Sequence, residues 1–210
     1  MSAMALADER SDLLETMAFD PVEGIRLLEL HLERMKASAK ALGFAFDRHE
    51  VRNELQAATF RLREKSRLRL LASRRGSVAI EVREHCTWPQ AIMHVAIVPR
   101  NAPADDPRLR HKTTDRSIYR DALRRGGTYE VLMTDQQGYL TEGCFSTIFV
   151  ERGDKLLTPP LRRGVLPGIL RQSLIDMGEA VEADLRPHDL DNGFFIGNAS
   201  RGMVAASTAR

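Results

Sequence analysis

The stretch His111-Lys112-Thr113-Thr114 decides how the rest of the sequence is interpreted, because four further motifs follow it along the chain. These are Thr141-Glu142-Gly143, Thr158-Pro159-Pro160, Leu166-Pro167-Gly168-Ile169 and Gly197-Asn198-Ala199-Ser200-Arg201-Gly202. A lysine amine can form an imine with a carbonyl compound, and a helix start or a glycine-containing turn can bind a phosphate. Together the motifs predict a site for a phosphorylated cofactor that is held through an imine.

Composition excludes several other classes of function. The chain has 210 residues, 43% of them hydrophobic, which is enough for one large domain or two small ones with real cores. A formal net charge of +2 favours neither nucleic acid nor a membrane surface as a partner, and no apolar stretch is long enough to span a bilayer. The first ten residues lack the pattern of a signal peptide. Cys86 and Cys144 have no metal-ligand spacing and fit a reducing compartment, so we expect a cytoplasmic protein without a metal site.

The first half of the sequence predicts an α+β unit. We expect strands at residues 12–19, 25–28, 66–73, 77–84 and 90–99, and helices at 30–42 and 48–65. Asp47 is the expected N-cap of the second helix. The polar, proline-containing residues that follow predict a boundary: residues 1–100 form a small N-terminal domain and residues 101–110 an interdomain linker.

The second half, residues 111–210, is expected to form a domain that carries the site. Its predicted helices lie at residues 115–125 and 169–177, and its predicted strands at 130–134, 140–142, 146–151, 155–157 and 194–196.

Lys112 and Glu142 are the candidate catalytic residues. Burial would lower the pKa of the lysine and make it a better nucleophile, although an isolated lysine is more often a surface residue. Glu142, at the end of a predicted strand, could face the ring nitrogen of a pyridine-type cofactor and keep it protonated. The alternative for Glu142 is a solvated glutamate at a turn.

Three segments could bind a phosphate. The predicted helix that starts at Gly168 and Ile169 offers free N–H groups, and plain helix entry is the alternative. Ser200 and the backbone of residues 197–202 could close the same site, or form a surface turn. Arg34 could pair with the phosphate, or be solvated as most arginines on amphipathic helices are.

A basic stretch between residues 61 and 75 has two possible roles. No aromatic residues interleave with it, so a solvated helix and strand face is favoured over a nucleic-acid site. Within this stretch, Arg67 and Arg69 project together and could hold substrate carboxylates.

Taken in order, the motifs resemble those of the class IV aminotransferase family, the fold type IV pyridoxal-phosphate enzymes. The resemblance runs from about residue 12 to residue 203 and is strongest to the aminodeoxychorismate lyase group, which includes the lyase domain fused to aminodeoxychorismate synthase component I. Further residues that carry the resemblance are Leu14-Glu15-Thr16-Met17, His31-Leu32-Glu33-Arg34, Arg116 with Tyr119, and Arg171.

This resemblance implies a cofactor, pyridoxal 5'-phosphate, and a role for each candidate residue. Lys112 would form the Schiff base and move the substrate proton, and Glu142 would pair with the pyridine nitrogen. Phosphate ligands would be Arg34, the backbone of Gly168 and Ile169, and Ser200; substrate contacts would be Thr16, Arg67, Arg116 and Tyr119. The implied architecture is a small N-terminal domain and a larger β-barrel-like C-terminal domain, in a homodimer that acts on a small amino-acid-like substrate.

The resemblance leaves the reaction open. Branched-chain aminotransferases carry a tyrosine five residues after the lysine, where this chain has Ser117, and Arg116 is typical of the lyase-like members. Ala18 and Leu170 stand where the family often has arginine and threonine. The expected activity is therefore 4-amino-4-deoxychorismate lyase, which forms 4-aminobenzoate and pyruvate for folate biosynthesis. A branched-chain or D-amino-acid aminotransferase and a non-catalytic homologue that binds pyridoxal phosphate or phosphate are the alternatives.

Overall fold

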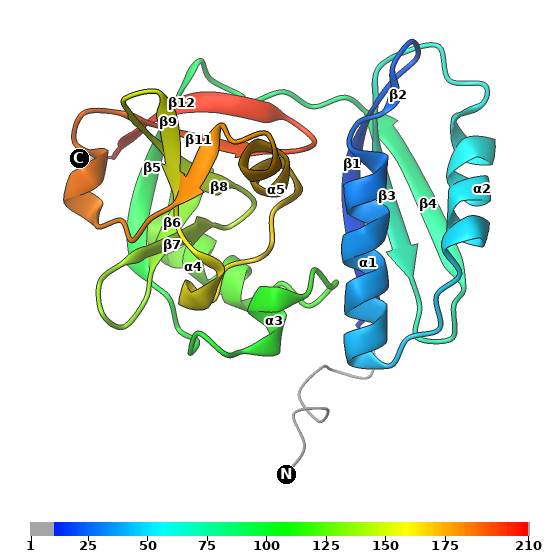
Figure 1. The fold of residues 1–210 in the computed structure, drawn as a ribbon, viewed down its shortest axis with the longest axis horizontal. Helices are drawn as coiled ribbons and strands as arrows, with labels where there is room; N and C mark the ends of the chain where they lie inside the picture. Colours follow the sequence, from blue (N-terminus) through cyan, green and yellow to red (C-terminus); the bar gives the residue numbers. More distant parts are fainter. Residues whose placement is uncertain (1–10, 210) are drawn as a thin grey trace. The chain divides into compact units, whose positions relative to one another are not determined.

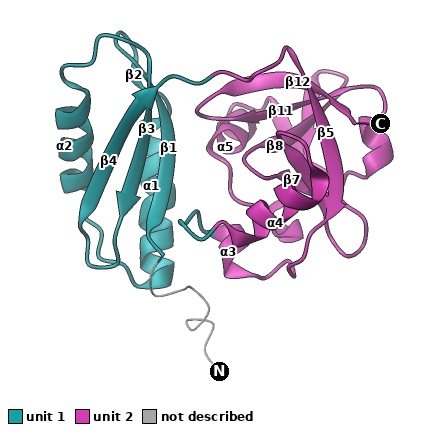
Figure 2. Ribbon diagram, turned by 180° about the vertical axis from the view of Figure 1, so that it is seen from behind, with its two compact units in different colours: residues 1–86, 111–115 teal, residues 87–110, 116–210 magenta. Residues whose placement is uncertain are grey.

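The computed structural model describes residues 11–209, and their contacts divide the chain into two compact units (Figure 2). Unit 1 contains the described residues up to Cys86 and the segment His111–Asp115. Unit 2 contains Thr87–Arg110 and the described residues from Arg116 onward. A four-stranded sheet lies in the first unit and an eight-stranded sheet in the second, each with its own helices (Figure 1). This arrangement confirms the predicted α+β class.

Unit 1 is an antiparallel sheet in the order β2-β1-β3-β4. Its strands are β1 (Leu13–Asp20), β2 (Gly24–Ile25), β3 (Ser66–Ala72) and β4 (Val78–Glu84). Because side chains alternate along a strand, Leu13 and Met17 of β1 and Leu68 and Leu70 of β3 share one buried face. The other face carries the residues between them.

Helices α1 (Leu28–Leu42) and α2 (Arg48–Thr59) pack on the buried face and share its core. The predicted cap is confirmed, since the Asp47 carboxylate accepts hydrogen bonds from the backbone N–H groups of His49 (2.8 Å) and Glu50 (3.1 Å). The second helix ends at Thr59, earlier than the expected residue 65; four of the five residues from 61 to 65 are charged, and of these five only Leu62 packs against the core.

The sheet of unit 2 is curled into a half-barrel, with strand order β10-β9-β8-β11-β12-β5-β6-β7. Its strands are β5 (Ile92–Pro99), β6 (Val131–Thr134), β7 (Leu140–Gly143), β8 (Thr147–Arg152), β9 (Lys155–Thr158), β10 (Ala180–Glu182), β11 (Phe194–Asn198) and β12 (Gly202–Thr208). Buried apolar side chains from β5, β8 and β11 fill its interior, among them Val95, Ile148 and Ile196.

Two features of this sheet differ from the sequence-based expectation. The sequence analysis placed residues up to 100 in the smaller domain, 101–110 in a linker and 111–210 in the larger domain. The contacts instead place residues 87–110 with the larger sheet and His111–Asp115 with the smaller one. The reason is that β5 pairs in parallel with β12 and β6, both far away in sequence (Ile92 with Ala205, Ala96 with Val131). The strands β10 and β12 were not predicted.

The helices of unit 2 are α3 (Pro107–Arg110), α4 (Ser117–Gly126) and α5 (Ile169–Asp176), with 3-10 turns η2 (Leu161–Arg163) and η3 (Pro187–Leu190). α4 packs on β5 and β6, and α5 packs on β10 and β11. Among the described residues, no helix combines the length and apolar composition that crossing a membrane requires.

Candidate active site

Lys112 lies in a short extended segment that is hydrogen-bonded to the start of β1. The Leu14 N–H donates to the Lys112 carbonyl (2.9 Å), and the Thr114 N–H donates to the Asp12 carbonyl (2.9 Å). The Thr114 hydroxyl also accepts from the Asp12 N–H (3.0 Å). These contacts, between residues about 100 positions apart in sequence, hold the lysine segment to β1 through the main chain of Lys112 and Thr114 and through the Thr114 hydroxyl.

Arg34 is held by a buried carboxylate that the sequence analysis did not single out. Glu15 points from β1 toward α1, where its two oxygens accept from the Arg34 Nε (2.8 Å) and Nη2 (2.6 Å). The second of these oxygens also lies 2.7 Å from His31 Nδ1. Glu15 and His31 are almost fully buried, at 1% and 2% exposure. The three side chains form a buried ionic cluster, called below the Glu15 cluster.

The electrostatics of the Glu15 cluster favour a charged Glu15 and a neutral His31. Burial alone would raise the pKa of Glu15, but the charges and hydrogen bonds of Arg34 and His31 outweigh it and lower the pKa to about 2. Burial lowers the pKa of His31 despite the nearby Glu15 charge, and the charges of Arg34 and Lys112 add to the lowering. The other ring nitrogen of His31, Nε2, is buried and has no hydrogen-bond partner among the described residues.

Thr16 and Arg67 lie on the sheet face opposite the helices, both partly buried. Arg67 is directly across from Ala18 in the β1–β3 register, and Thr16 is directly across from Arg69. Arg67, on β3, therefore lies beside Ala18, the position on β1 where the family often has an arginine.

Glu142 is the penultimate residue of β7, a buried carboxylate in unit 2 with a partner on each oxygen. Its Oε1 accepts from the Tyr119 hydroxyl (2.8 Å) and its Oε2 from the Leu166 N–H (3.1 Å). Burial raises the pKa of Glu142, while the Tyr119 hydrogen bond, the Arg116 charge and the Leu166 N–H oppose the rise. No lysine or arginine of the described chain forms an ion pair with Glu142, so its negative charge lacks a direct cation.

Arg116 and Tyr119, predicted as substrate contacts, adjoin Glu142. The Arg116 guanidinium lies over the Tyr119 ring, 3.4 Å from its centroid, and donates from Nη2 to the Cys144 carbonyl (2.8 Å). Its Nη1 is buried without a partner in the described residues. Burial raises the pKa of Tyr119, which keeps the phenol protonated as a donor to Glu142.

The turn after Glu142 is fixed by a second buried carboxylate that sequence reasoning missed. Glu130 accepts from the backbone N–H groups of Val131 (2.9 Å), Cys144 (2.7 Å) and Phe145 (3.2 Å), and from the Ser146 hydroxyl (2.7 Å). Burial raises the pKa of Glu130 to about 7, although all four donors favour the charged form. Glu130 thereby positions the loop that leads from Glu142 into β8.

The start of α5 and the β11–β12 turn lie at the same end of the half-barrel. Gly168 is the N-cap of α5 and has no side-chain cap; a Cβ at this position would lie 2.8 Å from the Thr147 hydroxyl. Thr147 is in turn paired with Gly197 of β11, and a Cβ at Gly197 would lie 2.9 Å from a methyl group of Leu170. The helix start is thus pressed against β8 and β11, and only glycine fits at its cap.

Ser200 lies in the turn that follows. Its buried hydroxyl has no hydrogen-bond partner in the described part of the chain. The sequence analysis counted on backbone N–H groups here, but those of Ser200 and Arg201 already donate to the Asn198 carboxamide (3.0 and 2.9 Å). In this turn it is the Ser200 hydroxyl that remains available to a ligand.

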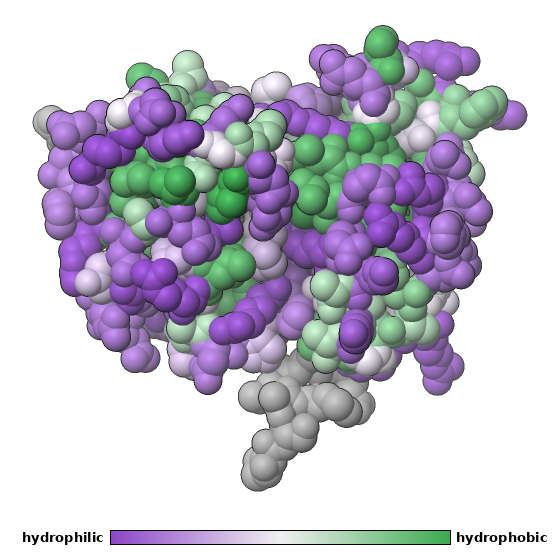
Figure 3. All heavy atoms as spheres, viewed as in Figure 1, coloured by the Kyte–Doolittle hydropathy of each residue, from purple (hydrophilic) through white to green (hydrophobic). Residues whose placement is uncertain are grey.

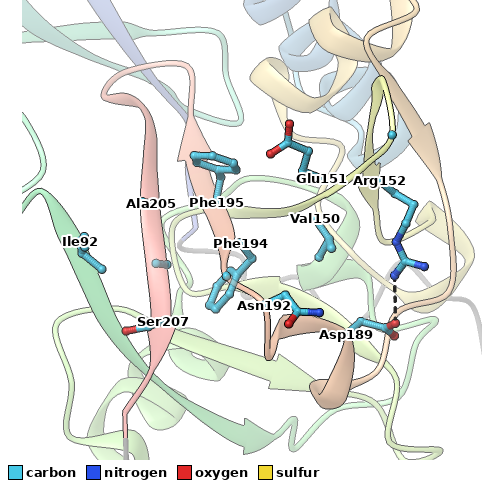
Figure 4. Close-up of a pocket in the computed structure, with 13 residues that line it drawn as sticks. Ile92, Val150, Glu151, Arg152, Asp189, Asn192, Phe194, Phe195, Ala205 and Ser207 are labelled. Atoms are coloured by element: carbon cyan, nitrogen blue, oxygen red, sulfur yellow. Dashed lines mark ion pairs between the residues drawn. The ribbon is translucent and has the colours of Figure 1, made fainter.

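A separate cavity of ≈ 840 Å³ in unit 2 contains none of the predicted residues (Figure 4). It is lined by strands β5, β8, β11 and β12 and by the residues around η3, and an ion pair between Arg152 and Asp189 (3.5 Å) lies beside it. The candidate site is therefore defined by its side chains and not by this cavity.

Comparison with known proteins identifies the family. The family model described as "Amino-transferase class IV" matches residues 12–208. A protein of Schizosaccharomyces pombe named "Putative aminodeoxychorismate lyase" is 30% identical over 195 residues, which cover 88% of this chain and 83% of the relative. This chain belongs to the class IV aminotransferase family, whose members are pyridoxal-phosphate-dependent enzymes, and the resemblance seen in the sequence is confirmed.

Solved structures agree with this assignment. A "Putative amino-acid aminotransferase" from Mesorhizobium loti superposes with a TM-score of 0.85 at 30% identity, covering 95% of this chain and 100% of the other. "A hypothetical aminotransferase from Mycobacterium tuberculosis" with α-ketoglutarate and PMP bound has a TM-score of 0.83 at 22% identity, covering 98% and 83%. The second of these shows a shared fold.

The side chains present here fit pyridoxal phosphate. The protonated ring nitrogen of this cofactor needs a buried anion, and its phosphate needs several hydrogen-bond donors around it. Glu142 is a buried carboxylate without a direct cation, and the Ser200 hydroxyl is a buried donor without a partner. The uncapped start of α5 adds free N–H groups, which an approaching anion meets without side-chain obstruction at Gly168.

Proposed function

We propose that this enzyme is a 4-amino-4-deoxychorismate lyase that releases 4-aminobenzoate and pyruvate. The observation that carries the proposal is the chain-long similarity to the Schizosaccharomyces pombe protein. Arg116 and Ser117 support it, because they stand where the lyase-like members and the branched-chain aminotransferases differ. A cytoplasmic location and a role in folate biosynthesis are parts of the same proposal.

We propose the following roles for the side chains. Lys112 holds the cofactor covalently and takes the proton from the substrate carbon that bears the amino group. When bound, pyridoxal phosphate withdraws electrons from that carbon. Glu142 accepts the hydrogen bond of the pyridine nitrogen, and the Tyr119 hydroxyl keeps the Glu142 carboxylate in place. Arg34, the backbone of Gly168 and Ile169, and the Ser200 hydroxyl hold the phosphate.

Lys112 also determines how the reaction ends. In the lyase reaction the bond between the ring and the enolpyruvyl oxygen breaks, and Lys112 returns the proton to the leaving group as it becomes pyruvate. Loss of the ring proton and of this group leaves the aromatic ring of 4-aminobenzoate. Thr16, Arg67 and Arg116 are the proposed substrate contacts.

An aminotransferase acting on branched-chain or D-amino acids is the second candidate, favoured by the 30% identity to the Mesorhizobium loti protein over all of that chain. The two activities are separated by incubating the enzyme with 4-amino-4-deoxychorismate and, separately, with amino acids and a keto acid. We expect 4-aminobenzoate and pyruvate in equal amounts, without a need for keto acid. Amino transfer that depends on a keto acid, with no 4-aminobenzoate, would refute the lyase proposal.

Replacing Glu142 by glutamine is expected to weaken pyridoxal-phosphate binding by about 10- to 100-fold, the range for losing a hydrogen bond to a charged group. The substitution keeps the size of the side chain but removes the anion that pairs with the ring nitrogen. Equilibrium dialysis of the cofactor measures the effect. Glu151→Gln, at an exposed position of β8, is the matched control and should bind normally. Equal affinities in the two variants would remove Glu142 from the cofactor site.

The homodimer is likewise a proposal. Figure 3 shows apolar side chains in patches on the surface, and the paired strands β5 and β12 expose Ile92 (53%) and Met203 (39%). Such side chains are suited to burial against another subunit. Light scattering coupled to gel filtration gives the mass directly.

A further inference from the structure

Arg201 lies within a group of three aromatic rings in unit 2, those of Trp88, Tyr129 and Phe145. Its guanidinium carbon is 5.2 Å, 5.5 Å and 5.3 Å from their respective centroids, and its Nη1 donates to the Tyr129 hydroxyl (2.7 Å). Phe145 stacks with Trp88 (6.0 Å) and meets Tyr129 edge to face (5.6 Å). These four residues are called below the Arg201 cluster. Each ring contributes a cation–π attraction to the guanidinium.

The Arg201 cluster is fixed to the turn that carries Ser200. Asn198 accepts the N–H groups of Ser200 and Arg201 on its side-chain oxygen and donates from its Nδ2 to the Phe145 carbonyl (2.9 Å). The Trp88 indole N–H donates to the Gly202 carbonyl (3.1 Å). Rings and turn are therefore held together before any ligand arrives, which lowers the entropy cost of binding.

Two members of the Arg201 cluster lie close in sequence to candidate cofactor-binding residues of unit 2. Phe145 is three residues after Glu142, in the loop that Glu130 holds, and Ser200 directly precedes Arg201. The Arg201 cluster is consequently connected to Glu142 and to Ser200 through short and hydrogen-bonded stretches of chain.

Arg201 lacks the partner that such a side chain usually has. No carboxylate in residues 11–209 forms an ion pair with it, and the Tyr129 hydroxyl accepts from one of its two terminal nitrogens. A guanidinium is always charged, and its planar fork matches a carboxylate with two parallel hydrogen bonds. Trp88, Phe145 and Arg201 are partly exposed, and Tyr129 is 48% exposed, so a ligand can reach the group.

We propose that the Arg201 cluster is a substrate-specificity site that binds a carboxylate attached to a flat, unsaturated ring. The guanidinium would pair with the carboxylate, and the aromatic side chains would pack against the ring. This inference rests on the proposed function and names the part of the substrate that is recognised. A branched aliphatic side chain offers no flat ring to these aromatic side chains, so the site favours the ring carboxylate over a branched-chain amino acid.

Trp88 makes the proposal directly measurable, because it is the single tryptophan of the chain. The cofactor-loaded enzyme is titrated with cyclohex-1-ene-1-carboxylate, which does not absorb where tryptophan is excited, and the dissociation constant is taken from the fluorescence change. Cyclohex-1-ene-1-carboxamide is the uncharged counterpart. We expect saturable binding of the carboxylate and at least tenfold weaker binding of the amide, about the loss of one charged hydrogen bond.

Variants assign this binding to Arg201. Arg201→Gln should weaken it by at least about tenfold, and Arg201→Lys should restore only part of it, because an ammonium lacks the planar fork. Arg120→Gln, at an exposed position of α4, should bind as the wild type does. If Arg201→Gln fails to fold, Tyr129→Phe provides the second test, since it keeps the ring, removes the hydroxyl acceptor of Arg201 and should weaken binding severalfold.

Several outcomes would overturn the inference: no binding to the wild type, equal binding of acid and amide, or unchanged affinity in the Arg201 or Tyr129 variants. Failure of the proposed function is recognised separately, by the absence of 4-aminobenzoate release from the wild type. An enzyme that releases 4-aminobenzoate while Arg201→Gln binds the ring carboxylate normally would keep the lyase proposal and refute only this one.

Discussion

Replacing Lys112 by alanine is expected to lower kcat by about 10⁴-fold, the upper end of what a positioned acid–base group contributes. The same variant should lose covalent retention of the cofactor, because alanine has no amine to attach it. Mass spectrometry after borohydride reduction measures retention, and product release measures kcat. Lys36→Ala, at an exposed position of α1 in the same unit, is the control and should keep both.

Lys112→Ala should lower activity without a large loss of stability. The lysine segment is joined to β1 through the Lys112 carbonyl and the main chain of Thr114, and alanine keeps both. The free energy of unfolding should therefore change by no more than about 1 kcal/mol, the typical effect of a single substitution, because the backbone contacts remain. Small amines added to the solution should restore part of the activity, because they can supply the missing base. Covalent cofactor retention in Lys112→Ala would assign the attachment to another residue.

Sequence reasoning singled out the residues whose chemistry is distinctive, and it missed the buried carboxylates that hold neighbouring groups in place. Lys112 and Glu142 stand out in ordered motifs, and Asp47 follows a local capping rule. Glu15 was quoted only as part of a motif, although a carboxylate at a core-facing position between Leu13 and Met17 is itself a signal of a buried ion pair.

Strand pairing between residues far apart in sequence was the second feature that could not be predicted from the sequence. Nothing local shows that β5 pairs with β12, which starts more than a hundred residues later, so the sequence placed β5 with the wrong sheet. The same holds for the Arg201 cluster, because its members come from four separate segments between Trp88 and Arg201 and meet only when the half-barrel closes. In contrast, α1 and α2 follow from apolar periodicity and caps that lie within a few residues.

Replacing Glu15 by alanine is expected to destabilise unit 1 by about 3–5 kcal/mol, the usual cost of removing one partner from a buried ion pair. The loss arises because Arg34 stays charged in a nearly dry environment, and because His31 loses its remaining partner. Urea denaturation monitored by hydrogen exchange in β1 and α1 reports on this unit. Glu15→Gln separates charge from packing, and Glu151→Gln is the exposed control.

The stabilisation by Glu15 should depend on pH in a definite direction. The pKa of Glu15 falls from 4.5 to about 2 on folding, so the native state binds fewer protons and the stabilisation is fully present above pH 4.5. It is lost as the pH falls from about 4.5 toward 2, and amounts to about 3 kcal/mol at 1.36 kcal/mol per pKa unit. The difference in unfolding free energy between the wild type and Glu15→Gln should therefore shrink across this range. Parallel curves would mean that the carboxylate is not paired as described.

The same substitution connects stability to the proposed cofactor site. Arg34 is a proposed phosphate ligand, and Glu15 fixes its guanidinium through two hydrogen bonds. Without Glu15 the guanidinium loses this orientation, so pyridoxal-phosphate affinity should fall even in the fraction of Glu15→Gln that remains folded. Equilibrium dialysis under conditions where the variant is fully native tests this, and Arg34→Lys shows the effect of losing the planar fork alone. An unchanged cofactor affinity in both variants would leave Glu15 with a structural role only and would remove Arg34 from the phosphate site.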